Sequence, residues 1–176
     1  MKTIMAFVTT VLLLQCIPEA DAKLGSFTLE TMIGESDSIV IGFVRSVTAD
    51  ENGSIVATIK INKTLKGDTA NELVISVDRS WTCDISEAKA GERILLFIFS
   101  DKKTGKNRIS ESGRGRMPID SVDGKEYATF WREVIMPQGV EIIPGPEPMY
   151  KFIQRARLSD LLAYINKVTK KSPNPH

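Results

Sequence analysis

Apolar residues occur in short runs and alternations along residues 39–99, and this pattern predicts a β-rich domain. Residues 39–47 form an almost continuous apolar run, which is typical of a strand buried on both faces. Residues 55–61 instead have isoleucine or alanine at every second position, as in a strand with one buried face. Asn52-Gly53 lies between these runs and predicts a tight hairpin turn. Further strands are predicted at residues 73–77, 94–99 and 108–110.

Helical spacing of apolar residues occurs on either side of these strands. A short helix is predicted over residues 26–35, where Gly34 can end it. A second helix is predicted over residues 158–169, with an apolar stripe and Ser159 as its cap. Residues 170–176 are predicted to form a disordered tail. The fold class is therefore mainly β, a small antiparallel barrel with a short N-terminal and a C-terminal helix packed against it.

Residues 126–148 are predicted to form an appendage of this barrel. Their aromatic part resembles a hairpin, and residues 144–148 form a proline-rich, exposed linker because proline continues neither a helix nor a sheet well. Trp131, with Phe130 and Tyr127, has two interpretations. The three aromatic side chains either form an exposed docking surface or a satellite core beneath the linker.

Residues 1–22 have the layout of a secretory signal peptide. Lys2 provides the positive charge, residues 5–14 are apolar, and an Ala-x-Ala site ends at Ala22. The apolar run is about half of the roughly 20 residues that a membrane-spanning helix needs. Cleavage after Ala22 and a secreted or periplasmic location are therefore predicted. The alternative is a lipid anchor at Cys16, which also follows an apolar run.

Charge and composition limit the partners of the mature chain. The 176 residues include 23 Lys and Arg and 22 Asp and Glu, and the predicted leader removes one base and two acids. The remainder is near neutral, and only 7% of the chain is aromatic, which argues against nucleic acid as a partner. Residues 23–169 are predicted to form one domain with no membrane span, and the oligomeric state stays open.

Catalytic and metal-binding side chains are scarce. Cys83 is the one cysteine left after cleavage, so it cannot form an internal disulfide. Next to Trp81 and an apolar strand it is either a buried, inert thiol or a reactive one. His176, in the terminal tail, is the only histidine. We therefore expect no catalytic triad, no metal site and no cofactor, and a protein that is not an enzyme.

Acidic residues are plentiful, but no spacing marks a pair of carboxylates for glycoside hydrolysis or a complete calcium loop. We interpret them as surface acids. The candidates are Asp78, Asp84, Glu87, Asp120, Asp123 and Glu126. Asn52 and Asn62 also begin segments that match the N-glycosylation pattern.

Arg114 and Arg116, each preceded by glycine, form the sharpest candidate for binding. Guanidinium groups suit phosphate, sulfate or carboxylate ligands. Together with Arg79, Arg93 and Arg132 they could form an anion-binding face. The alternative is a charged loop that only aids solubility.

Several short motifs resemble the netrin-like and tissue-inhibitor-of-metalloproteinase-like domains over roughly residues 26–118. The motifs are the segments 36–44, 64–67 and 91–97, and Trp81-x-Cys83. The resemblance implies a five-stranded barrel of the oligosaccharide/oligonucleotide-binding (OB) type in a secreted protein. Cys83 occupies a position where the family has a disulfide cysteine. The predicted mature chain begins at Lys23, whereas the family's inhibitors begin with a zinc-chelating cysteine.

The first functional hypothesis is a secreted or periplasmic, non-catalytic binding module, with an inhibitor among the options. It would bind an extracellular protein or an anionic partner through the barrel loops. The alternatives are a carboxylate-based enzyme that acts on glycans, and a structural envelope lipoprotein anchored at Cys16.

Overall fold

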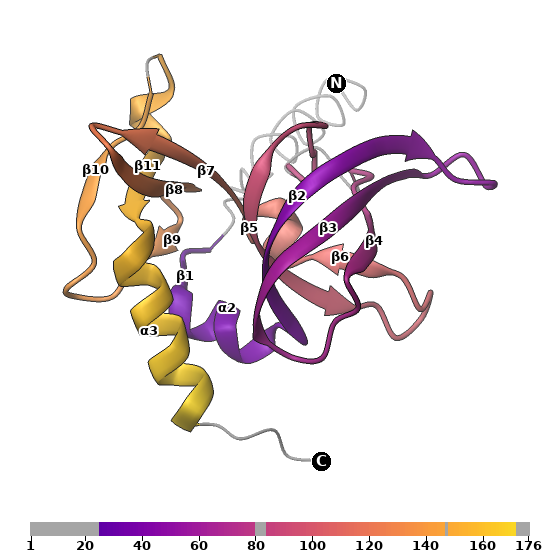
Figure 1. The fold of residues 1–176 in the computed structure, drawn as a ribbon, viewed down its shortest axis with the longest axis horizontal. Coiled ribbons are helices and arrows are strands. Elements are labelled where there is room, and N and C mark those ends of the chain that lie inside the picture. Colours follow the sequence, from indigo (N-terminus) through magenta and orange to yellow (C-terminus); the bar gives the residue numbers. More distant parts are fainter. Residues whose placement is uncertain (1–24, 80–83, 147, 172–176) are drawn as a thin grey trace, which may run out of the picture.

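The computed structural model describes residues 25–79, 84–146 and 148–171 (Figure 1). The predicted leader, residues 1–22, lies outside the described residues. Two units stand side by side in Figure 1, a barrel and a second sheet that carries the C-terminal helix. None of the described helices combines the length and the apolar character that crossing a membrane requires.

Five strands close into the barrel, in the order β2-β3-β4-β6-β5 and back to β2. The pairings are antiparallel except between β4 and β6, which run parallel where Ser76 pairs with Arg108. The mainly β fold class and the five-stranded barrel predicted from the sequence are thereby confirmed. The barrel strands are β2 (Ser38–Ala49), β3 (Ile55–Lys66), β4 (Glu72–Ser76), β5 (Arg93–Ser100) and β6 (Asn107–Ile109).

The predicted alternation in β3 places its side chains as expected. Ala57 and Ile59 are fully buried inside the barrel, while Lys60, next to Ile59 in the same strand, is exposed. β2 and β3 approach each other closely at Gly42, where an added Cβ would lie 2.6 Å from Ile59 Cγ2 and 2.8 Å from the Lys60 carbonyl oxygen. The β2–β3 register shifts next to Gly42, and such bulges bend a sheet enough to close it into a barrel.

A second antiparallel sheet continues from β5. The first half of β5 pairs with β7, and its second half pairs with β6. From β5 the neighbouring strands of this sheet are β7, β8, β11 and β10, and β10 forms its free edge away from the barrel. Residues 126–148 contribute β8 and β10 to this sheet, but the two strands do not pair as a hairpin because β11 lies between them, and β11 had no sequence prediction. The strands are β7 (Arg116–Val122), β8 (Lys125–Trp131), β10 (Ile142–Pro144) and β11 (Ile153–Arg157).

The proline-rich linker begins later than predicted. Pro144 is the last residue of β10, where its missing N–H is tolerated because β10 is an edge strand. A short 3₁₀ helix, η2 (Met149–Lys151), follows before β11.

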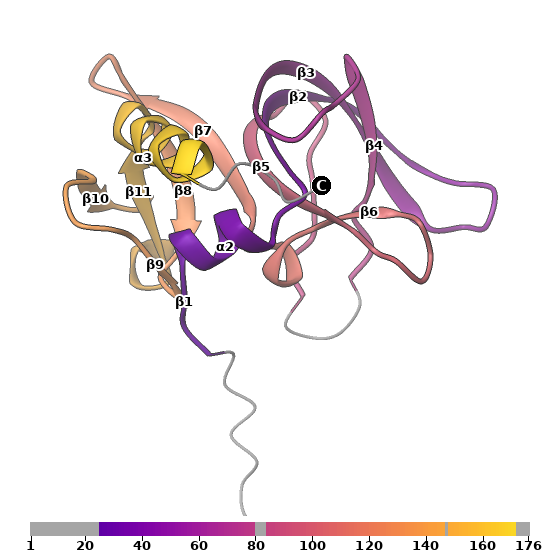
Figure 2. The same ribbon diagram turned by 90° about the horizontal axis from the view of Figure 1, so that it is seen from below.

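Two α-helices cover one side of both sheets (Figure 2). α2 (Leu29–Glu35) begins after Thr28, whose hydroxyl accepts a hydrogen bond from the Thr31 N–H at 3.0 Å. β1 (Phe27–Thr28) pairs with β9 (Val134–Ile135) and holds the start of α2 against the second sheet. α3 (Leu158–Lys171) ends two residues beyond the predicted helix, so the predicted tail starts too early.

Candidate functional site

The structure places three of the five arginines predicted to form an anion-binding face in different environments. Arg114 is only 6% exposed. Arg116 forms an ion pair with Glu92, to which its Nε donates a hydrogen bond at 3.1 Å. Arg79 is exposed and forms an ion pair with Glu87. These arginines do not form one exposed cationic face, and anion binding by them stays a prediction.

The loop that carries Arg114 is buried because its glycines allow close packing. Gly113 has a φ of +91°, and an added Cβ would lie 2.4 Å from the backbone of Ile85. At Gly115 an added Cβ would lie 2.9 Å from the Phe97 carbonyl oxygen. The Ile85 N–H donates to the Ser112 carbonyl at 3.0 Å. The loop is thus fixed against β5 and against the segment of Ile85 and Ser86, and its first residues form the wall of a cleft.

This barrel-end cleft consists of two adjoining hollows. The larger has a volume of about 370 Å³, the smaller about 210 Å³, and they share Phe99 and Ser112. Their walls come from the end of α2, from the β5–β6 hairpin and from the 3₁₀ helix η1 (Glu111–Gly113). The larger hollow is lined by Glu35, Phe99, Ser110, Glu111 and Ser112, and the smaller by Asp84, Ser86, Phe99, Asp101, Arg108, Ile109 and Ser112.

Two carboxyl groups meet in the larger hollow. Burial raises the pKa of Glu111, and so do a hydrogen bond with Glu35 and the negative charge of that side chain, while Arg114 opposes the shift. Glu111 and Ser112 both have positive φ angles, 52° and 49°, which are unusual for residues other than glycine. Strained backbone of this kind is often found at functional sites. A carboxyl pair with a raised pKa can both donate and accept hydrogen bonds.

Hydrogen bonds around the cleft hold its walls in place. Ser36, just after α2, lies with its hydroxyl 3.0 Å from that of Ser110. Asp84 is 1% exposed and accepts a hydrogen bond from the Ser86 N–H at 2.9 Å. Arg108 Nη2 lies 4.0 Å from this carboxylate. The cleft therefore has a largely fixed polar floor before any ligand enters, as binding sites commonly do.

The second predicted site, around Trp131, is divided between two faces of a sheet. Phe130 and Tyr127 are 1% and 4% exposed, so neither contributes to an exposed aromatic surface. Trp131 is half-buried at the end of β8 and pairs with Ile153. Neighbouring residues of a strand point to opposite faces, so Trp131 does not share the core face of Phe130.

Sequence reasoning did not identify Glu35 or Glu111. They are far apart in the chain, and no motif joins them. Of the acids considered for catalysis, Asp84 does line the cleft. Trp81 and Cys83 lie outside the described residues. Across the described ranges, no group of three or more His, Cys, Asp or Glu side chains is placed to hold a metal ion.

No protein-family model matches the chain, and no curated protein matches its sequence.

Proposed function

We propose that this chain is an exported, non-catalytic binding module that holds a hydroxyl-bearing ligand, such as a saccharide, in the barrel-end cleft. The observation that carries the proposal is the carboxyl pair of Glu35 and Glu111 beside the ring of Phe99. Carboxyl and serine hydroxyl groups suit ligand hydroxyls, while an aromatic ring offers an apolar face to carbon-bound hydrogens. A concave site with a few convergent polar groups and a perturbed pKa is a reasonable binding site. The export part of the proposal depends on the predicted leader.

A carboxylate-based enzyme is the second candidate, and the raised pKa of Glu111 favours it because a general acid must be protonated. The geometry favours binding instead. Glycosidases keep their two carboxyl groups about 5–9.5 Å apart, on either side of the bond that is cleaved. Glu35 and Glu111 instead lie together on the wall of one hollow, where Glu35 raises the pKa of Glu111, and this arrangement does not place them on either side of a bond.

Calorimetric titration of the mature chain with a panel of neutral oligosaccharides tests the proposal. We expect Glu111→Ala and Phe99→Ala to weaken binding roughly tenfold each, the effect of one lost hydrogen bond or apolar contact. The matched controls are Glu51→Ala, an exposed acid on the β2–β3 turn, and Phe43→Ala on the outer barrel surface, 41% exposed. Both controls should leave binding unchanged.

The proposal fails if no oligosaccharide binds at millimolar concentration, or if the cleft variants and the controls bind equally well. Reducing-end release during the same titrations would favour the enzyme instead. Far-UV circular dichroism of each variant shows whether the fold is retained.

A further inference from the structure

The free end of the second sheet carries a groove that is separate from the barrel-end cleft. β10 lies at the outer side of the second sheet in Figure 1, while β6, at the cleft, lies in the barrel. The groove has a volume of about 280 Å³. It is lined by two cationic side chains, one amide and three apolar residues: Arg132, Lys151, Gln154, Ile142, Ile143 and Pro144.

The two cations of the groove have no acidic partner within the ranges that the structure describes. Among the described residues, no carboxylate lies within ion-pair distance of Arg132 or Lys151. Neighbouring arginines of the same sheet differ: Arg155 pairs with Asp120, and Arg157 with Glu141. The described part of the chain therefore does not balance the positive charge of the groove, which is complementary to an anionic group.

The backbone holds Arg132 in position. Its Nη1 donates a hydrogen bond to the Lys151 carbonyl at 2.9 Å, and its N–H donates to the Phe152 carbonyl at 2.9 Å. A guanidinium group has five N–H donors in a fixed, planar arrangement. Toward the described residues it uses one of them, and the others suit a carboxylate, whose two oxygens match the same geometry.

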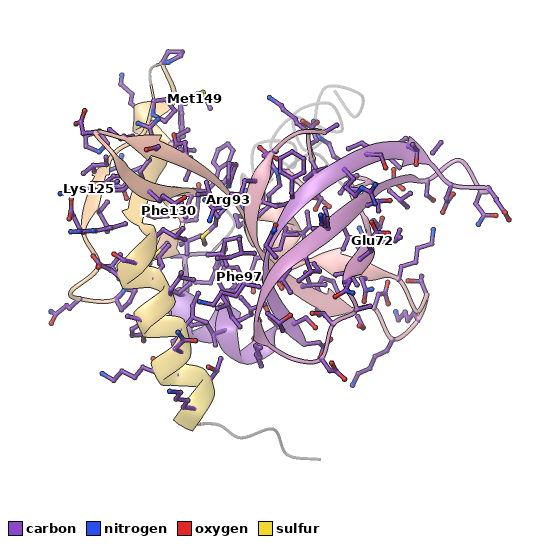
Figure 3. The ribbon with its side chains drawn as sticks, in the orientation of Figure 1. Glu72, Arg93, Phe97, Lys125, Phe130 and Met149 are labelled. Atoms are coloured by element: carbon purple, nitrogen blue, oxygen red, sulfur yellow. The ribbon has the colours of Figure 1, made fainter. Side chains whose placement is uncertain are left out.

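Apolar surface and free backbone groups accompany this charge. Ile142 is 42% exposed, and Met149 and Phe152 near the groove are 40% and 56% exposed. Figure 3 shows Met149 at the outer end of the second sheet, well apart from Phe97 in the core. The Arg157 N–H donates to the Glu141 carbonyl at 2.9 Å. In an antiparallel pair of strands, hydrogen-bonded and non-hydrogen-bonded residue pairs alternate. Glu141 and Arg157 form a hydrogen-bonded pair, so the next pair, Ile142 and Ala156, is not hydrogen-bonded. The N–H and C=O of Ile142 therefore point away from β11, toward the free edge.

We propose that this groove binds an extended, acidic segment of a partner protein. A carboxylate of the segment pairs with Arg132 and Lys151, a neighbouring apolar side chain packs on Ile142 and Pro144, and the segment's backbone bonds to the edge at Ile142. The combination of charge, apolar wall and edge backbone favours a peptide over a sulfated polysaccharide. A polysaccharide has neither an apolar side chain for the wall nor a peptide backbone that could pair with the edge. The strand is short, and because Pro144 has no N–H, Ile142 supplies the one backbone donor of β10 on this edge.

The test uses a short, blocked peptide of alternating Glu and Leu with a fluorescent label, measured by anisotropy. Matched peptides replace Glu by Gln or by Lys, and a labelled heparin fragment represents the polysaccharide. We expect the Glu peptide to bind at least about tenfold more tightly than the Gln and Lys peptides. Added salt should lower the affinity of the Glu peptide, because it screens the charges. The double variant Arg132→Gln/Lys151→Gln should lose at least about tenfold in affinity.

A matched control removes the same charge elsewhere. Lys102→Gln/Lys103→Gln lies in the exposed β5–β6 loop and should leave peptide binding unchanged. Equal losses in both double variants would indicate general electrostatic attraction and overturn the proposal. So would a preference for the heparin fragment, or no binding of the Glu peptide at millimolar concentration.

The groove and the cleft are tested separately. Glu111→Ala should leave binding of the Glu peptide unchanged, and Arg132→Gln/Lys151→Gln should leave saccharide titrations unchanged. Failure of one proposal can thus be distinguished from failure of the other.

Discussion

Replacement of Gly113 by alanine tests whether the buried loop fixes the wall of the cleft. The substitution adds a methyl group 2.4 Å from the Ile85 carbonyl carbon and from the Ser86 nitrogen. These are backbone atoms, which cannot rotate away as a side chain can. Gly124, in the β7–β8 turn, is the matched control: its φ is +73°, but an added Cβ would have nothing within 4 Å.

The difference between the two variants isolates the steric cost. A left-handed backbone costs alanine about 1–2 kcal/mol, partly offset by the lower entropy of its unfolded chain, so Gly124→Ala should lose about 1 kcal/mol. Gly113→Ala adds the cost of overpacking, about 1–3 kcal/mol, for a total of about 2–4 kcal/mol. With a urea slope of about 2 kcal/mol/M, its unfolding midpoint should lie about 1 M below that of the control.

Urea unfolding followed by tryptophan fluorescence provides the measurement, and the slope should be the same in both variants. Because Glu111 and Ser112 directly precede Gly113, saccharide binding in the cleft should weaken in Gly113→Ala and not in Gly124→Ala. Equal midpoints for the two variants would refute the packing argument.

The remaining predictions concern charge, packing and processing. The pKa of Glu111 is raised in the folded state, so stability should fall as pH rises between its unfolded and folded pKa values. Glu111→Gln should remove that fall when melting temperatures at about pH 4 and about pH 8 are compared with the parent, and an unchanged slope would contradict this. Lys66 donates to two carbonyls at the end of α2, so Lys66→Met should lose about 1–2 kcal/mol in urea unfolding, and exposed Lys63→Met almost nothing. Phe97→Ala, in the shared core, should lose about 3–5 kcal/mol by the same assay, and a loss below about 1 kcal/mol would show that the site is not tightly packed. Mass spectrometry of the exported chain should give an N-terminus at Lys23, and a lipid-modified one would contradict the predicted cleavage.

The barrel was predictable because the pattern of apolar and polar residues in its strands shows which side chains are buried. β3 alternates between buried and exposed residues, and β5 is apolar almost throughout. β11 gives no such signal. Its one fully buried residue is Ala156, set between glutamine and arginine residues, and the strand forms because β8 and β10 pair with it on both sides.

The site was less predictable because glycine has two structural uses. From the sequence, Gly113 and Gly115 were only the residues that precede two candidate binding arginines, whereas the structure uses them for close backbone packing that buries Arg114. The carboxyl pair depends on where α2 ends relative to η1 and on the strained backbone at Glu111. Neither feature has a local sequence pattern, so only tertiary packing brings the pair together.

One strand supports both proposed binding sites. Leu95 and Phe97 of β5 pack into the core beneath the two helices, while Ile94, Leu96 and Ile98 fill the barrel. The same strand pairs with β2 along one edge and with β6 and β7 along the other. Both hydrophobic cores contain side chains of β5, so unfolding of this strand would expose both of them. We therefore expect the barrel and the second sheet to unfold together. A destabilising change in the shared core should therefore weaken the cleft and the groove alike, whereas the surface variants proposed above should affect only one of them.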